Sequence, residues 1–164
     1  MIIETRIKLQ SPMLGELHQD VAGVRRFKKL QGRIAVNTFR YREQFKAACN
    51  LLKLTNIDID TILPEESFES PTIVLYRRIF SRIHVELFEA IQKGCELTME
   101  WGIRDDLPRS PSLEQFSSIL SATGKYLGLS QFGTKFGFGR FNVMSVKECN
   151  HHYHNVNSSG APPT

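Results

Sequence analysis

The chain has 164 residues, of which 41% are hydrophobic and 23% are charged, and its formal net charge is +4. This length and composition predict one globular domain with a substantial core, and the sequence has no apolar run long enough for a membrane span. The start, "MIIETRIKLQ", lacks the layout of a signal peptide, so we expect a cytoplasmic protein, and three separated cysteines predict reduced thiols.

The first half of the chain alternates between regular patterns and irregular stretches. "ETRIKL" has the period-two alternation of a half-buried strand, and Tyr41, Phe45, Ala48 and Leu52 recur at helical spacing. The predicted elements are a strand, an irregular stretch, a short strand, a helix and an acidic loop, over residues 4–9, 11–32, 33–36, 38–54 and 57–71.

The second half contains the clearest strand, "CELTMEW", in which Cys95, Leu97, Met99 and Trp101 point to one side. "HVELFEAIQKG" has the spacing of a short helix, with Gly94 in the place of a C-terminal cap. The predicted elements are a strand, a short helix, a strand, a helix that begins at Ser110-Pro111, and a last strand, over residues 72–80, 84–94, 95–101, 110–126 and 140–146.

Without the short elements the order is strand, helix, strand, strand, helix, strand. This order predicts an α+β fold of the ferredoxin-like, split βαβ type, with an antiparallel sheet, helices on one face and a glycine-rich loop before the last strand. We expect this single domain to span residues 1–148 and a polar, flexible tail to span 149–164.

The cations are unevenly distributed along the chain. They crowd residues 25–46, whereas acids gather in residues 57–69, and such segregation can create a face that attracts polyanions. The alternative is an ordinary solvated surface. The residues that we expect to contact backbone phosphates are Arg25, Arg26, Lys28, Lys29 and Arg33.

Residues 124–143, "GKYLGLSQFGTKFGFGRFNV", gather five glycines with three cations. The segment leaves a helix and enters a strand, which is the reverse of a dinucleotide-binding loop, and no Walker motif is present, so we expect no nucleotide cofactor. A loop of this kind can hold phosphates through N–H groups and cations, while its aromatic rings stack on unpaired bases. The alternative is a tight structural crossover. The predicted contact residues are Lys125, Gly128, Gly133, Lys135, Gly137, Phe138, Gly139 and Arg140.

Gly137-Phe138-Gly139-Arg140, with Gly128 and Gly133 upstream, resembles the glycine-rich loop of the RAMP superfamily, the ferredoxin-like RNA-binding proteins of CRISPR effector complexes and repeat-processing nucleases. The resemblance implies RNA binding within a larger protein complex. Many members of that family have two ferredoxin-like units, whereas this chain has room for one. "VRRF" and "GKYLGLSQFG" also look similar to uncharacterised bacteriophage and prophage proteins.

Candidates for catalysis and metal binding are few. His18, with Tyr41 or a lysine, could cleave RNA through attack by the 2′-hydroxyl, although a lone loop histidine is more often a plain polar residue. The tail gathers possible zinc ligands, and two acid pairs could bind Mg²⁺, but neither set has a companion motif, so we expect no metal site. These residues are Cys149, His151, His152 and His154, with Asp58, Asp60, Asp105 and Asp106.

The leading hypothesis is therefore a non-catalytic protein that binds single-stranded nucleic acid, RNA rather than DNA, of CRISPR-effector or phage type. One alternative is a small phage-type protein that binds a host defence protein or its own copies. A second is a metal-independent RNA endonuclease that uses His18.

Overall fold

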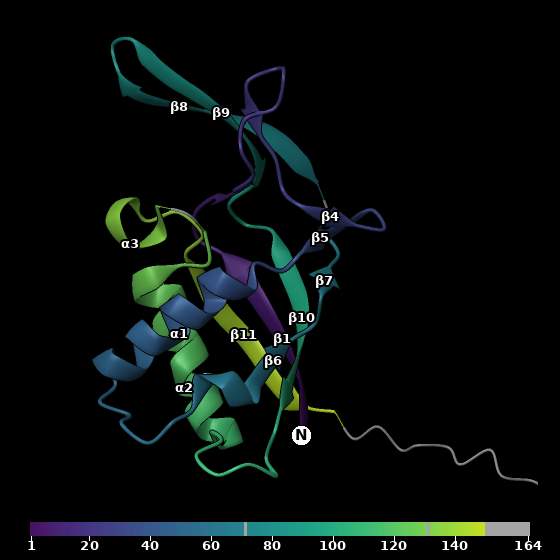
Figure 1. Ribbon diagram of the computed structural model, residues 1–164, viewed down its shortest axis with the longest axis vertical. Coiled ribbons are helices and arrows are strands. Elements are labelled where there is room, and N and C mark those ends of the chain that lie inside the picture. The colour runs from purple at the N-terminus through teal and green to yellow at the C-terminus, as the bar shows by residue number, and fades with distance from the viewer. Residues whose placement is uncertain (71, 131, 150–164) are drawn as a thin grey trace, which may run out of the picture.

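The computed structural model describes residues 1–70, 72–130 and 132–149. At its centre lies a four-stranded sheet in the order β11-β1-β10-β6 (Figure 1). All three strand pairs are antiparallel. Read across the sheet, these strands are the fourth, first, third and second of a split βαβ unit, numbered by their order along the chain. The predicted ferredoxin-like α+β fold is thus confirmed. The strands span Ile2–Leu9 (β1), Ile62–Pro64 (β6), Glu96–Ile103 (β10) and Phe141–Glu148 (β11).

Two helices cover one face of this sheet (Figure 1), α1 (Thr38–Leu51) and α2 (Leu113–Ala122), and a π-helical turn, η2 (Thr123–Leu127), extends α2. The helix α1 begins after Asn37, whose side chain accepts a hydrogen bond from the third backbone N–H that follows. The helix α2 begins after Ser112 in a capping box with Gln115, two residues later than the cap that the sequence predicted.

The core between the helices and the sheet is built around Trp101, which is fully buried. Its ring lies 5.8 Å from Tyr41, 5.4 Å from Phe45 and 5.6 Å from Phe116, measured between ring centroids. Tyr41 and Phe45 come from α1 and Phe116 from α2, so one strand residue joins both helices to the sheet. Aromatic pairs at such distances add to the stability that burial of apolar area provides.

The opposite face of the sheet is open and carries charges of both signs. Residues of β1 and β10 alternate, so Glu4, Glu96 and Glu100 point away from the buried side together with Arg6 and Lys8, and Arg6 forms an ion pair with Glu96 at 2.5 Å. Glu4 stands directly opposite Glu100 in the register, and Glu65 lies in the same shallow hollow. Burial is the main cause that raises the pKa of Glu65.

The segment predicted as the second strand belongs to a long hairpin that projects from the rest of the molecule (Figure 1). This hairpin joins β8 (Ile73–Ser81) to β9 (His84–Ile91), so the helix predicted over residues 84–94 is wrong. β9 also pairs with β2 and β3 along its other edge. Phe88 and Ala90 on one face of β9 pack with Phe132 and Phe138, while Glu89 and Ile91 on the other face meet the basic segment and the main core. This burial of consecutive residues hides the alternation of a strand.

The place of the second strand in the central sheet is taken by β6, which lies within the stretch predicted as an acidic loop. It has three residues and ends at Pro64, too short for an alternating pattern to be visible in the sequence. The short strand expected over residues 33–36 is confirmed as β5. The remaining strands are β2 (Met13–Leu14), β3 (Val24–Arg25), β4 (Lys29–Leu30), β5 (Arg33–Ala35) and β7 (Ser67–Phe68).

The tail predicted from residue 149 onward lies, except for Cys149 itself, outside the described residues. Among the residues that the structure does describe, no helix has the length and apolar character needed to cross a bilayer.

Candidate nucleic-acid interface

The glycine-rich segment folds back on the N-terminal part of the chain and on the hairpin. Its short helix, α3 (Gly133–Phe136), lies between η2 and β11 in the sequence. The backbone N–H of Gly139 donates to the carbonyl of Pro12 at 2.7 Å, and the N–H of Leu14 donates to the Ser130 hydroxyl at 2.8 Å. The segment is therefore fixed in place by bonds to the stretch that follows β1.

Four of its five glycines are needed for close packing. A Cβ atom on Gly124, Gly128 or Gly133 would come within 2.4 Å of a backbone oxygen, and one on Gly139 would lie 2.5 Å from the Ser130 side chain. Gly137 differs, because a Cβ there would meet no atom within 4 Å. The structural-crossover alternative thus accounts for most of the glycine cluster.

The N–H groups of this segment are also largely engaged. Gly128 donates to the Thr123 carbonyl at 2.7 Å, Gly133 to the Ser130 carbonyl at 3.1 Å, and Gly137 to the carbonyl of Gly133 at 2.9 Å. A phosphate would therefore meet side chains of this segment rather than a cradle of N–H groups.

Arg140 holds the segment together from within. Its guanidinium donates to the carbonyl of Lys125 at 2.7 Å and to the carbonyl of Gly133 at 3.1 and 3.0 Å. Since these acceptors are neutral, Arg140 keeps its full positive charge beside the segment while it fixes its shape.

Two lysines and two aromatic rings point outward, and we refer to Lys125, Tyr126, Lys135 and Phe136 as the loop surface. The Lys125 ammonium lies 5.1 Å from the centre of the Tyr126 ring, and the Lys135 ammonium lies 5.3 Å from that of Phe136. Tyr126 is 50% exposed and Phe136 49%. The sequence from Gln115 to Lys147 contains no Asp or Glu, so no local acid offsets these charges.

Arg78 of β8 joins the loop surface to the hairpin, a link that the sequence did not reveal. Its guanidinium carbon lies 4.5, 4.1 and 5.0 Å from the ring centres of Phe132, Phe136 and Phe138. Tyr76, two residues earlier on the same face of β8, contacts Phe138 edge-on at 5.6 Å. Side chains alternate along a strand, so Tyr76 and Arg78 of β8 point to one face and Arg77 to the other. This alternation could have indicated that Arg78, like the aromatic Tyr76, faces the glycine-rich segment.

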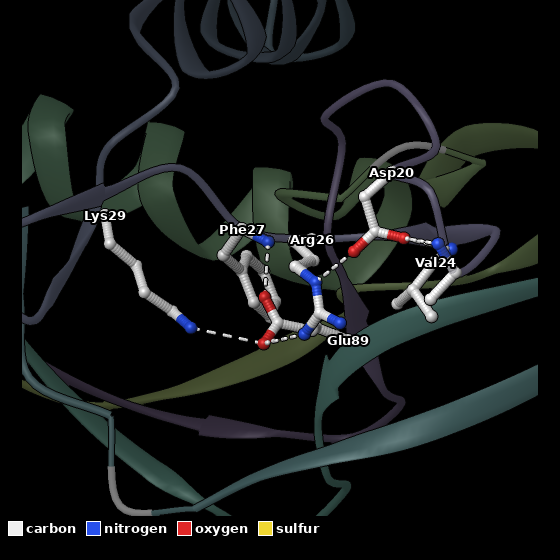
Figure 2. Close-up of polar contacts among 7 residues, drawn as sticks. Asp20, Val24, Arg26, Phe27, Lys29 and Glu89 are labelled. Atoms are coloured by element: carbon white, nitrogen blue, oxygen red, sulfur yellow. Dashed lines mark hydrogen bonds and ion pairs between the residues drawn. The ribbon is translucent and has the colours of Figure 1, made fainter.

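The basic segment predicted to contact phosphates is mostly occupied by carboxylates (Figure 2). Arg25, Arg26, Lys29 and Arg33 each form at least one ion pair with an acid. Their partners are Glu86, Asp20, Glu89 and Glu65, at 3.2, 2.5, 3.2 and 3.7 Å.

Glu89 of β9 is the centre of this network. Only 5% of it is exposed, and its carboxylate accepts a hydrogen bond from the Phe27 N–H at 2.9 Å as well as the Lys29 ion pair (Figure 2). Arg26 lies 3.6 Å from the same carboxylate. These cations thus attach the basic segment to the hairpin.

Lys28 differs from its neighbours, because it is exposed and has no carboxylate partner among the residues that the structure describes. Of the five cations predicted in this segment, it is therefore the one whose charge the described residues do not offset.

His18 lies exposed in the stretch between β2 and β3. Tyr41, one of the partners considered for a nuclease, is buried and donates its hydroxyl to the Ile62 carbonyl at 3.1 Å. Burial raises the pKa of Tyr41, so its phenol is a poor base near neutral pH.

The acid pairs considered for Mg²⁺ have structural partners. Asp60 pairs with Arg42, Asp106 with Arg104 and Asp105 with the N-terminal ammonium, while Asp58 caps a short helical turn. No group of three or more possible metal ligands occurs within the described part of the chain, and His151, His152 and His154 lie outside it.

Comparisons with known proteins give a likeness of fold. No protein-family model and no curated protein sequence matches the chain. Among solved structures, a chain of a "Type IV-B CRISPR Complex" aligns with a TM-score of 0.54 and 14% identity. The alignment covers 100% of this chain and 96% of that one.

The packing of the glycines can be tested by comparing Gly128 with Gly137. Both have a positive φ, +77° and +79°, but Gly137 is left-handed helical with ψ of 15°, whereas Gly128 has ψ of 162° and a Cβ there would lie 2.4 Å from the Phe138 carbonyl oxygen. We expect Gly137→Ala to lower the free energy of unfolding by about 1 kcal/mol through backbone strain. Gly128→Ala should cost about 2–4 kcal/mol, because the clash adds to the strain of a backbone conformation that is essentially restricted to glycine. Urea denaturation measures both, and equal losses would contradict the packing role.

The Glu86 ion pair predicts a dependence of stability on pH. Burial acts to raise the pKa of Glu86, but the hydrogen bond and charge of Arg25, aided by His84, outweigh it and lower the pKa below the usual 4.5. The stability that this carboxylate contributes is therefore complete above pH 4.5 and is lost as the pH falls through the lowered pKa. Glu86→Gln should unfold more easily than the wild type at pH 7, and the difference should shrink in acid.

Chemical denaturation between pH 7 and pH 3 measures the free energy of unfolding of each variant. Glu148→Gln, at an exposed residue at the end of β11, is the control. A difference between Glu86→Gln and the wild type that stays constant from pH 7 to pH 3 would contradict the assignment.

Proposed function

We propose that this protein binds single-stranded nucleic acid, RNA in preference to DNA, at the loop surface and without catalysis. The observation that carries the proposal is the pairing of exposed lysines with half-exposed rings, Lys125 with Tyr126 and Lys135 with Phe136. Cations attract the phosphate backbone and aromatic faces stack on unpaired bases, a combination typical of single-strand binding.

The charges elsewhere support this choice of surface. The open face of the sheet carries Arg6 and Lys8 beside Glu4, Glu96 and Glu100, and Arg6 pairs with Glu96, so the charges on this face largely offset one another. In the basic segment, Arg25, Arg26, Lys29 and Arg33 form ion pairs with carboxylates. Among the described residues, this leaves Lys28 as the cation of that segment that can contact a phosphate. The loop surface combines positive charge with a local absence of acids in the sequence.

The rigidity of the glycine-rich segment supports binding as well. Its bonds to Pro12 and its internal bonds through Arg140 hold the loop surface in shape before a ligand arrives. Less conformational entropy is then lost on binding than a mobile loop would lose.

The family context of the proposal comes from two likenesses. The Gly137-Phe138-Gly139-Arg140 motif resembles the RAMP loop, and the fold is similar to that of a chain in a "Type IV-B CRISPR Complex". We infer a role as an RNA-binding subunit of a multi-protein effector of the CRISPR type, in which residues 1–148 act as one domain.

The proposal predicts salt-dependent binding that depends on the loop surface. Lys125→Ala and Lys135→Ala should each weaken binding of a labelled single-stranded RNA, and each should lower the slope of log affinity against log salt by about 0.7. Phe136→Ala should weaken binding with little change in that slope, because stacking releases few counterions; about 1–3 kcal/mol per stacked base is typical. Fluorescence anisotropy at several salt concentrations measures both quantities.

Lys147→Ala is the matched control, since it removes the same charge near the far end of β11 from the glycine-rich segment. Equal affinity of the wild type and the Lys125→Ala, Lys135→Ala double variant would exclude the loop surface. The same titration with DNA of matching sequence tests the preference for RNA.

A second candidate function is docking to another protein, and the hairpin favours it. Leu75, Ile79, Ile83 and Val85 are 64%, 65%, 97% and 40% exposed. Ile79 stands opposite Val85 in the register, on the face away from Arg78 and the rings that it contacts. Arg77 lies between Leu75 and Ile79 on this face, so the apolar surface is concentrated toward the tip of the hairpin, at Ile79, Ile83 and Val85, and exposed apolar residues grouped in this way are typical of a site of association.

The docking candidate is tested with further copies of the chain as the partner. If copies associate through the hairpin, the mass from light scattering should rise with concentration, and Ile79→Glu should keep the protein monomeric. Leu51→Glu, at an apolar residue that is 57% exposed at the end of α1, should have no effect. A wild type that stays monomeric at all concentrations would exclude self-association through the hairpin.

A further inference from the structure

A cleft of about 330 Å³ opens beside the start of α1. Its walls come from the stretch after β1, the residues just before β4, β5, β7, β10 and the glycine-rich segment. This volume is within the range of small-ligand sites, which begins at about 300 Å³. The residues that form its floor are Phe27, Ile34, Phe68, Met99, Trp101 and Leu129.

The floor is apolar and rich in aromatic rings. Trp101 is fully buried, and Phe27 and Phe68 are 8% and 4% exposed. A surface of this kind is poorly matched to a free ion, whereas a flat ring gains from leaving water and contacting it.

The rim of the cleft is polar and carries a positive charge. Glu16 accepts hydrogen bonds from the Asn37 amide and, at 3.0 Å, from Nε of Arg40, so this acid and this cation offset each other. Lys28, which also lines the cleft, has no carboxylate partner among the described residues. The rim thus favours a ligand whose ring is attached to an anion.

The cleft is continuous with the loop surface along the chain. Leu129 of its wall follows two residues after η2, the turn that carries Lys125 and Tyr126. One wall of the cleft and the loop surface are therefore parts of the same segment of chain.

We propose that the cleft takes one unstacked nucleobase, with the attached phosphate against Lys28. This inference rests on the proposed function, because the base belongs to the strand that the loop surface binds. An apolar side chain of a protein partner would gain from the floor, but it would make no use of Lys28.

Trp101, the single tryptophan of the chain, lies fully buried behind the lining of the cleft, so its fluorescence reports a bound ring through a change in the packing of the floor, and equilibrium dialysis measures the binding itself. Titration with uridine or adenosine monophosphate should change its fluorescence to saturation, while inorganic phosphate and ribose 5-phosphate should leave it unchanged. Excitation at the red edge of the indole band, with free tryptophan as a reference, corrects for absorption by the base.

Variants at the mouth of the cleft test the geometry. Thr38 is exposed at the first position of α1 and lines the cleft, so Thr38→Phe should fill the mouth and abolish the response, whereas Thr38→Ser should preserve it. Lys28→Gln should weaken the binding of a nucleoside monophosphate about two- to fivefold, the range of an exposed charge pair, and leave that of the nucleoside unchanged. Circular dichroism confirms that each variant is folded.

The outcomes separate this inference from the proposed function. Binding of RNA at the loop surface, without any binding of nucleotides in equilibrium dialysis, would overturn the cleft proposal alone. A response to nucleotides in a protein that binds no RNA would overturn the proposed function and, with it, the assignment of the base to a bound strand. A response to N-acetyl-leucinamide but not to nucleotides would assign the cleft to a protein side chain and overturn the proposal.

Discussion

The buried carboxylate of Glu89 is the contact on which the attachment of the β8–β9 hairpin to the basic segment depends. Burying a charge costs several kcal/mol unless it is paired, and here the Phe27 N–H, Lys29 and Arg26 meet it. Because Glu89 lies on β9 and its partners lie in the short stretch from Arg26 to Lys29, this contact joins the projecting hairpin to the basic segment. A stretch that reads in the sequence as a free cationic patch is therefore largely an internal anchor.

The glycine-rich segment shows a similar use of sequence for structure. Its glycines let the backbone pass close to Phe138, Leu127 and Phe141, and Arg140 closes the turn by bonding carbonyl oxygens. What remains for a ligand is the outer side, where Lys125 and Lys135 accompany two rings. A ligand site on such a segment is rigid before binding, and its affinity depends on the exposed side chains rather than on backbone N–H groups of a mobile loop.

How far the sequence could predict this structure differs between the sheet and the site. β1, β10 and α1 were recognised because each buries one face and so displays its period clearly. β9 was mistaken for a helix because packing against both of its faces buries consecutive residues, and β6 is too short to show any period. For the site, composition indicated the cations correctly, but ion pairs such as that of Arg25 with Glu86 join residues distant in the chain, and only the folded structure reveals them.

The uneven distribution of charge has a consequence for how the molecule meets a charged partner. Charges of both signs mix on the open face of the sheet, where Arg6 pairs with Glu96, whereas the stretch from Gln115 to Lys147 contains cations and no Asp or Glu. The net positive charge therefore lies to one side of the molecule, and in the field of a long polyanion such a charge distribution experiences a torque. The molecule would be turned before contact, with the glycine-rich segment leading, and collisions that begin in the wrong orientation would be corrected during the approach.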